Sequence, residues 1–328
     1  MRQFVMLALG CFLMSAVALS CGENTSEDEN SGQPKVDIPL FNSDSAYAYV
    51  ARQCSFGPRV PGTAAHQACL DWMVSFFKHT GADTVIVQNG EKTLYDGTKM
   101  PVRNVIAVYG QSNENRIMLC SHWDSRPFAD QESDSSLRHE AIDGADDGAS
   151  GVGVLMEIAR IVSANPPSSG VDIVLFDLED WGAPEWESQG SDNGWCLGSE
   201  YWAKHTHFPG YKAQYGILLD MVGGAETRFY REYYSETNVK WLNDKVWSAA
   251  NSAGLSNRFI DKTGGAITDD HIPVIRYAGI PCIDIVAYNP EGDAGFPEYW
   301  HTRRDNMDNI SKATLADVGK LILTLLYQ

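Results

Sequence analysis

The sequence has few basic residues for its length. Its 328 residues include 25 Lys and Arg against 43 Asp and Glu, which gives a formal net charge of −18. Because proteins neutralise phosphate groups with Lys and Arg, this deficit argues against nucleic acids and anionic lipid headgroups as main partners. Charged residues make up 21% of the chain and hydrophobic residues 44%. This composition predicts a folded protein with a substantial core over most of its length.

The sequence also lacks the cysteine patterns of zinc fingers and disulfide scaffolds. Its seven cysteines form no CxxC pair and no Cys/His zinc spacing. Cys11 and Cys21 belong to the N-terminal segment, which leaves an odd number for the folded part: Cys54, Cys69, Cys120, Cys196 and Cys282. An exported protein could pair two of these, and Cys54 and Cys69 are nearest in sequence, but the sequence does not determine the pairing. We expect most of the five to be buried small side chains.

The N-terminal apolar run, from Phe4 to Leu19, is too short and too weakly flanked for a membrane span. It predicts a signal peptide over residues 1–20. Two interpretations of the next residue stay open: Cys21 carries a lipid anchor, as in bacterial lipoproteins, or it is a spectator beside an ordinary cleavage site near Ala18. Residues 21–35 are polar and acidic and predict a flexible tether, so the folded domain is expected over residues 36–328. We therefore expect an exported protein, periplasmic or membrane-anchored as a bacterial lipoprotein, with a monomer as the default.

Helical and strand patterns alternate after this tether. Six short strands are predicted, at residues 84–88, 103–109, 116–121, 171–178, 215–221 and 280–285. Several of them are continuous apolar runs, which are typical of strands covered by helices on both faces. Six helices are predicted, at residues 43–51, 63–79, 151–162, 198–204, 238–253 and 312–327. The pattern predicts a single α/β domain with a mixed, largely parallel central sheet flanked by helices, in which ligands bind at the carboxyl ends of the strands.

Polar side chains that bind metals follow several of these strands. They are His122 and Asp124, Asp147 in the Gly-Ala-Asp-Asp-Gly-Ala-Ser-Gly loop at 144–151, the pair Glu179-Asp180, Asp220, and His301 near the C-terminus. Each one alone is more often a helix cap, a turn residue or a packed histidine. As an ordered set they are the N and O donors of a catalytic zinc. Two neighbouring carboxylates in an extended segment point to different sides, so one can bind the metal while the other stays free as a base.

The order of these residues resembles that of the M28-type zinc aminopeptidases, a phosphorylase/hydrolase-like fold, from about Arg59 to the C-terminus. Within that superfamily the sequence is more similar to the glutaminyl-peptide cyclotransferases of the animal type. The motifs that carry this resemblance are Arg-Val-Pro-Gly at 59–62, Leu-Gly-Ser at 197–199, Asp-Asp-His-Ile-Pro at 269–273, Phe-Pro-Glu-Tyr-Trp-His-Thr at 296–302 and Asp-Asn at 305–306.

The resemblance implies a role for each matching position. Asp147, Asp180 and His301 would bind zinc, with one ion per chain. Glu179 would act as the general acid and base. Asp220 and Asp270 form a carboxylate network that raises the pKa of Glu179, and Trp300 and Phe296 are walls of the substrate pocket. Either Trp181 or Trp186 is a candidate for a further wall. The chain departs from the family at Asp180, where Glu is usual, and at Asp284, where the animal enzymes have His.

The function that the resemblance implies is cyclisation of an N-terminal glutamine to pyroglutamate with release of ammonia. The substrates would be peptides and exported proteins that begin with glutamine. The principal alternative is a two-zinc aminopeptidase, because His122 and Asp220 fill the positions where M28 peptidases bind a second metal. A third hypothesis, a non-catalytic lipoprotein that binds peptides or glycans, is disfavoured because every expected ligand position is occupied.

Overall fold

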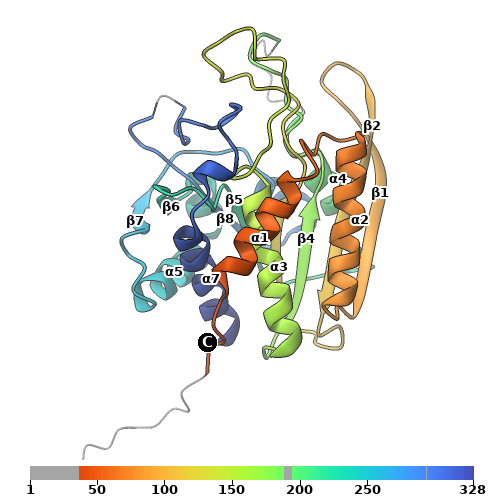
Figure 1. The fold of residues 1–328 in the computed structure, drawn as a ribbon. Coiled ribbons are helices and arrows are strands. Elements are labelled where there is room, and N and C mark those ends of the chain that lie inside the picture. Colours follow the sequence, from red (N-terminus) through yellow and green to blue (C-terminus); the bar gives the residue numbers. More distant parts are fainter. Residues whose placement is uncertain (1–36, 188–193, 293) are drawn as a thin grey trace, which may run out of the picture. The chain divides into compact units, whose positions relative to one another are not determined.

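The computed structural model describes residues 37–187, 194–292 and 294–328, which contain a six-stranded sheet (Figure 1). The strands are β1 (Thr84–Thr93), β2 (Lys99–Tyr109), β3 (Arg116–His122), β4 (Gly170–Phe176), β5 (Tyr215–Asp220) and β8 (Cys282–Val286), in the spatial order β1-β2-β4-β3-β5-β8. β3, β4, β5 and β8 are parallel, β2 is antiparallel to β4, and β1 and β2 form an antiparallel hairpin. The predicted α/β domain with a mixed, largely parallel sheet is confirmed. The signal peptide predicted over 1–20 and the tether over 21–35 lie outside the described residues, and the domain boundaries stay a prediction.

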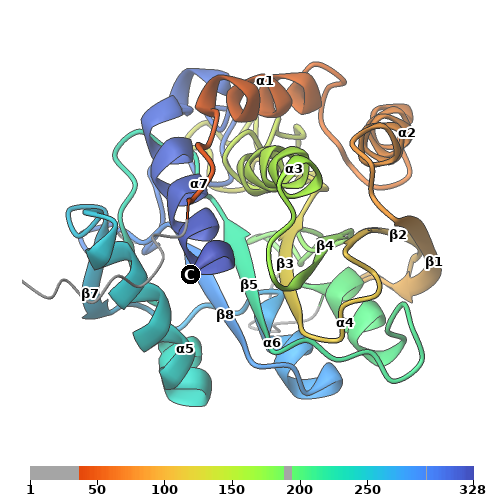
Figure 2. The same ribbon diagram turned by 90° about the horizontal axis from the view of Figure 1, so that it is seen from below.

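Helices cover both faces of this sheet (Figure 2). One face carries α1 (Ser43–Cys54), α2 (Ala64–His79), α3 (Ala149–Ala164) and α7 (Lys312–Tyr327); the other carries α4 (Leu197–Lys204), α6 (His271–Pro273) and the π-helical turn η1 (Val274–Ala278). α5 (Tyr233–Ser252) packs against β8 and α7. Alternate residues of β3 enter different cores: Leu119 joins the core with α3, and Met118 joins the core with α4. Burial on both faces explains why these strands read as continuous apolar runs.

The helix ends follow local capping. The Thr63 hydroxyl accepts a hydrogen bond of 3.2 Å from the His66 amide at the start of α2, as expected for an N-cap threonine. The helix predicted over 312–327 has these same bounds in the structure. α5 begins at Tyr233 rather than at residue 238, because the Glu232 carboxylate accepts hydrogen bonds from two amides of its first turn. No helix in the described ranges is long and apolar enough to cross a membrane.

Several short elements are absent from the prediction. β6 (Phe229–Arg231) and β7 (Phe259–Thr263) form a second, two-stranded sheet, and η2 (Met307–Asn309) is a 3₁₀ turn. Segments this short carry too little periodicity to be recognised. The β1–β2 hairpin is longer than predicted at its turn end, where exposed residues alternate with half-buried ones.

The cysteines are free among the described residues, and the expectation of buried side chains is confirmed. Cys69, Cys120, Cys196 and Cys282 are buried, and Cys54 is half-buried.

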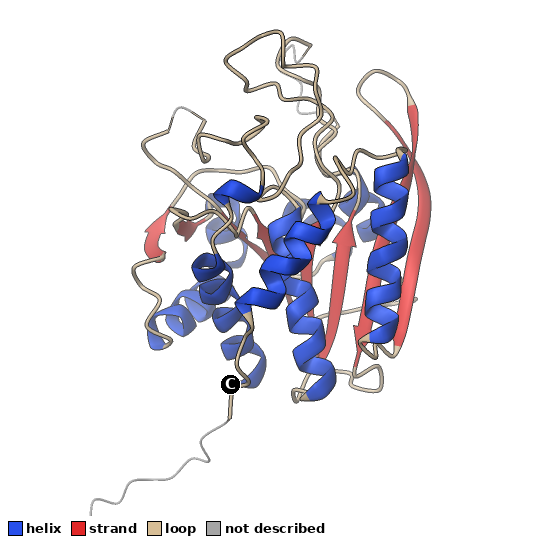
Figure 3. Cartoon of the chain, viewed as in Figure 1, coloured by secondary structure: helices blue, strands red, loops and turns tan. Residues whose placement is uncertain are grey.

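The parallel strands end where the long loops gather, at the top of Figures 1 and 3. β3 ends at His122, β5 ends at Asp220, and β4 leads into the turn that carries Glu179 and Asp180. The fold therefore brings the predicted site residues to one edge of the sheet, the usual place for a ligand in this kind of sheet.

Arg116 and Asp172 form a buried ion pair at the opposite end of β3 and β4, with two contacts of 2.6 Å. We expect Arg116→Ala to lower the free energy of unfolding by about 3–5 kcal/mol, because the fully buried Asp172 would keep a charge without its partner. Urea unfolding measures this loss. Lys99→Ala, which removes an exposed pair with Glu91, should leave the unfolding midpoint unchanged. Equal midpoints for the two variants would contradict the expectation.

Candidate metal and catalytic site

Two groups of nitrogen and oxygen atoms converge at the carboxyl ends of the parallel strands. In the first group, His301 Nε2 lies 3.3 Å from Asp180 Oδ1 and 3.6 Å from Asp147 Oδ2. In the second group, His122 Nε2 lies 2.9 Å from Asp147 Oδ1 and 3.2 Å from Asp220 Oδ1. All of these side chains are buried. The structure thus brings together every residue predicted as a metal ligand, and Asp147 belongs to both groups.

The loop before α3 holds Asp147 in place. Gly148 has a φ of 87°, and a Cβ at this position would lie 2.8 Å from the carbonyl oxygen of Asp124, so the loop requires glycine. The Asp305 carboxylate accepts hydrogen bonds from the amides of Asp146, at 2.7 Å, and Asp147, at 3.1 Å. These contacts fix the backbone that carries the Asp147 side chain. They also give a structural role to the Asp-Asn motif at 305–306.

The turn after β4 separates the two neighbouring carboxylates. The Asp124 carboxylate accepts hydrogen bonds from the amides of Glu179 and Asp180, at 3.2 Å each. Asp180 joins the first ligand group, whereas Glu179 lies with Cys196 and Asp269. The Cys196 thiol donates to Glu179 Oε1 across 3.3 Å. Glu179 therefore stays outside the groups that contain His301 and His122, as the sequence predicts for a base.

A second carboxylate orients His301. Asp130 Oδ1 lies 3.3 Å from His301 Nδ1, so Nδ1 donates to it and Nε2 faces Asp147 and Asp180. Arg126 holds Asp130 through contacts of 2.7 and 2.6 Å. Burial alone would raise the pKa of Asp130. Arg126 and His301 together outweigh this effect through their hydrogen bonds and charges, so the pKa lies below its usual value and this carboxyl stays ionised. A carboxylate behind a histidine is the usual support of a metal ligand, and no motif in the sequence pointed to Asp130.

Left-handed backbone conformations cluster at this site. Among the described residues other than glycine, four have a positive φ: Leu178, Cys196, Met221 and His301, at 48–55°. Leu178 precedes Glu179, Met221 follows Asp220, Cys196 contacts Glu179, and His301 belongs to the first ligand group. Such conformations are strained for L residues and concentrate at functional sites, where the surrounding structure enforces them. Their placement is evidence for function that does not depend on the side chains.

Glu179 lies in a buried carboxylate environment. Burial is the largest cause that raises its pKa well above the usual value, and Asp269, Asp180 and Asp270 raise it further. From the sequence we expect crowding by Asp220 and Asp270 to raise the pKa of Glu179. In the structure burial is the larger cause, and Asp270 contributes to the shift. Asp220 contacts His122 instead, and burial raises its pKa to about 6.

Asp284, where the animal enzymes have histidine, lies in the same carboxylate environment. Burial and the neighbouring Asp269 raise its pKa well above the usual value, and neither of its carboxyl oxygens has a hydrogen-bond partner among the described residues. On its other side, Asp284 Oδ2 lies 3.9 Å from Nδ1 of His271, whose Nε2 lies 3.2 Å from Glu232 Oε2. The departure at Asp284 therefore places a further buried carboxyl group near Asp269 and Glu232, two neighbours that the sequence did not point to.

A cavity of 490 Å³ opens onto both ligand groups and Glu179. Trp300 and Phe296 line it, and Trp300 stacks on His301 with ring centroids 3.6 Å apart. Trp195 and Tyr288 also line this cavity, and the sequence pointed to neither of them.

Neither of the expected candidates for the third wall lines this cavity. Trp181 packs in a separate apolar cluster with Leu178, and Trp186 contacts Phe128 and His139. Trp195 is at the start of the turn into α4, and no motif marks it.

The residues of the first group fit a metal ion. Asp180 Oδ2 is buried and has no hydrogen-bond partner in the described structure, which is costly unless a cation satisfies it. His301 Nε2 faces two carboxylates, an arrangement that needs a positive charge between or on these groups. One imidazole and two carboxylates are a donor set typical of a catalytic metal site with an open position. His122 Nδ1 is likewise buried without a hydrogen-bond partner among the described residues.

Comparison with known proteins places this site in context. The sequence pattern of Peptidase family M28 matches residues 104–326. The structure is similar to that of a Zn-dependent exopeptidase from Parabacteroides distasonis, with 49% identity, a TM-score of 0.87, and coverage of 89% of this chain and 100% of that chain. It is also similar to Bacteroides thetaiotaomicron glutaminyl cyclase bound to N-acetylhistamine, with 46% identity, a TM-score of 0.86, and coverage of 89% and 99%.

Curated relatives are more distant. The glutaminyl-peptide cyclotransferase of Bothrops jararaca is 25% identical over 247 residues, which are 67% of this chain and 63% of that protein. The chain spans between 45% and 64% of the length of the first three curated relatives that it matches. The bacterial glutaminyl cyclase is thus more similar than the curated animal protein, and the predicted animal type is not confirmed.

We expect Asp130→Asn to weaken metal binding, because His301 would lose the anionic partner that orients it. Loss of such a partner typically costs a factor of about 10–100 in metal affinity. Competition with a chelator of known affinity, on protein loaded with Zn²⁺, measures the change. Asp134→Asn, an exposed change in the same loop, is the matched control and should bind as the unaltered protein does. Equal affinities for Asp130→Asn and Asp134→Asn would contradict the role of Asp130.

Proposed function

The chain belongs to peptidase family M28, and we propose that within this family it acts as a zinc-dependent glutaminyl-peptide cyclotransferase. It would convert the N-terminal glutamine of peptides and proteins to pyroglutamate and release ammonia. The observation that carries the proposal is the 46% identity to a bacterial glutaminyl cyclase over 99% of that chain. The motifs that resemble the animal enzymes support the same reaction.

Asp147, Asp180 and His301 would hold the zinc ion, one per chain. When bound, zinc supplies a Lewis acid that polarises the γ-carboxamide of the substrate. Asp180 is one methylene shorter than the glutamate usual in the family, yet its Oδ1 still reaches to 3.3 Å from His301 Nε2. The buried Asp130 and Arg126 keep His301 turned toward this position.

Glu179 would move the proton of the reaction. The α-amine nitrogen of the glutamine bonds to Cδ, the carbon of its own side-chain carboxamide, the bond from that carbon to the amide nitrogen breaks, and one proton passes from the amine to the departing nitrogen. Glu179 accepts this proton and then donates it, which leaves ammonia and a five-membered lactam. A carboxyl transfers protons best when its pKa lies near the working pH. Burial raises the pKa of Glu179 in that direction.

The cavity walls and the carboxylate network would support this step. Trp300, Phe296 and Trp195 enclose the reacting atoms and reduce access of competing water. Because amine and carboxamide belong to one residue, the enzyme needs only to hold the glutamine in a curled conformer. Asp270 and Asp220, both buried, would complete the network predicted around Glu179.

The remaining expectations are proposals from the sequence alone. The protein would be exported, and it would be periplasmic or anchored to the membrane by a lipid on Cys21. It would be a monomer and would act on exported proteins. These proposals rest on residues 1–35 and on the resemblance. They are consistent with the acidic composition.

A two-metal aminopeptidase is the second candidate, because the group of His122, Asp147 and Asp220 also assembles. Asp147 belongs to both groups, so His122, Asp147 and Asp220 would hold the second metal, which would supply activation of water for hydrolysis. The Zn-dependent exopeptidase at 49% identity is compatible with this alternative.

Activity assays separate these two candidates. We expect the purified protein to release ammonia from a glutaminyl-alanine amide and to consume its free amine without releasing alanine amide. Release of alanine amide, or of leucine from a leucine anilide, without cyclisation would contradict the proposal and support the aminopeptidase.

The same assay tests Glu179. Glu179→Gln should keep its zinc and lose nearly all ammonia release, by a factor of at least about 100, because general acid/base groups contribute on this order. Glu226→Gln, an exposed change outside the site, is the matched control and should keep the activity of the unaltered protein. A Glu179→Gln variant that is as active as this control would overturn the assigned role.

A further inference from the structure

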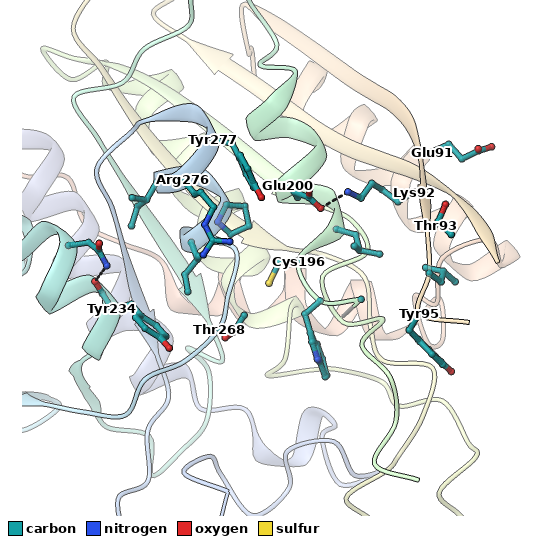
Figure 4. Close-up of a pocket in the computed structure, with 18 residues that line it drawn as sticks. Glu91, Lys92, Thr93, Tyr95, Cys196, Glu200, Tyr234, Thr268, Arg276 and Tyr277 are labelled. Carbon is teal, nitrogen blue, oxygen red and sulfur yellow. Dashed lines mark hydrogen bonds and ion pairs between the residues drawn. The ribbon is translucent and has the colours of Figure 1, made fainter. Parts of the chain in front are cut away.

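A second, larger cavity adjoins the candidate active site. It has a volume of 1140 Å³ and lies between the β1–β2 hairpin, α4 and the α6–η1 segment (Figure 4). The mechanism proposed above uses none of this space, because a single glutamine side chain occupies only the smaller cavity. We refer to the larger one as the outer cleft.

The outer cleft shares part of its wall with the active-site cavity. Trp195 and Thr268 line both of them. Cys196, which lines the outer cleft, contacts Glu179 on the inner side at 3.3 Å. A peptide whose first residue lies at Glu179 would reach this cleft if its next residues passed Trp195 and Thr268.

Most charges around the outer cleft are already paired. Lys92 pairs with Glu200, which also binds Lys204. Glu91 pairs with Lys99 at 2.8 Å. The carboxylates of the candidate catalytic site do not line this cleft. Apart from Arg276, the walls of the cleft therefore carry a net charge close to zero.

Arg276 is the exception. It is exposed on η1, and it makes no hydrogen bond or ion pair with any residue in the described part of the chain. Its guanidinium carbon lies 6.0 Å from the centre of the Tyr277 ring. Figure 4 shows Arg276 on the side of the cleft opposite Lys92 and Tyr95. An arginine without a partner on the wall of a substrate cleft offers a planar, bidentate site for a carboxylate.

We propose that the outer cleft binds the residues that follow the N-terminal glutamine, and that Arg276 selects peptides with an acidic side chain at the second or third position. This inference rests on the proposed function. In a chain of net charge −18, acidic peptides are repelled at long range, so a cation at the entrance is needed to admit them. The Debye length is about 8 Å at physiological salt, so a contact with Arg276 outweighs the more distant carboxylates.

Peptide pairs that differ only in charge test this selection. The substrates are the amides of Gln-Glu-Ala and Gln-Ala-Glu, each compared with its neutral isostere, Gln-Gln-Ala or Gln-Ala-Gln. We expect kcat/KM to favour the acidic member of at least one pair about two- to five-fold, the range typical of an exposed ion pair. The preference should appear in KM and should shrink when salt is raised to about 1 M, where screening shortens to about 3 Å.

Two variants assign the preference to Arg276. Arg276→Gln should bring the acidic-to-neutral ratio to one or below, and Arg276→Glu should lower it further. Arg52→Gln, an exposed change on α1 outside both cavities, is the matched control and should keep the ratio of the unaltered protein. A ratio of one in the unaltered protein, or an unchanged ratio in Arg276→Glu, would overturn the inference while ammonia release still supports the proposed function. If neither peptide of a pair released ammonia, the proposed function would fail and the inference with it.

Discussion

Burial of carboxylates at the carboxyl ends of β3, β4 and β5 is the constraint on which the rest of this structure depends. An ionised carboxylate removed from water is costly unless hydrogen bonds or a cation compensate for it. Asp124 and Asp305 are compensated by backbone amides of the loops that carry Glu179, Asp180 and Asp147. Asp130 is compensated by Arg126. These satisfied carboxylates hold the loops in place.

The remaining carboxylates are not compensated in this way, and they are the ones with a chemical role. Asp180 Oδ2, Asp269 Oδ2 and both oxygens of Asp270 and Asp284 are buried without hydrogen-bond partners among the described residues. A cation would satisfy the group around His301, and retained protons would satisfy the group around Glu179, whose members have raised pKa values. Metal binding and proton transfer would then be two responses to the same burial.

The sequence predicted the part of the site that follows directly from strand ends. An apolar run that stops at His122 or Asp220, and a Glu179-Asp180 pair after another run, need only the rule that parallel strands end at one edge. Asp130, Trp195 and Asp269 could not be assigned in this way, because loops place them and loop paths depend on tertiary contacts. Asp130 is recognisable only from its distance to His301, and Trp195 only from the cavity that it lines. The short strands β6 and β7 were missed for a related reason: pairing with each other, rather than local pattern, makes them strands.

We propose that Asp147, Asp180 and His301 bind one zinc ion and leave Glu179 free to transfer protons. Anomalous diffraction at the zinc absorption edge, from crystals of the zinc-loaded protein, locates the ion. We expect one strong peak within bonding distance of these three side chains, about 2.0–2.2 Å from the nitrogen and oxygen ligands, with Glu179 beyond that distance. A second peak of equal strength held by His122 and Asp220, or a single ion bound by Glu179, would contradict it.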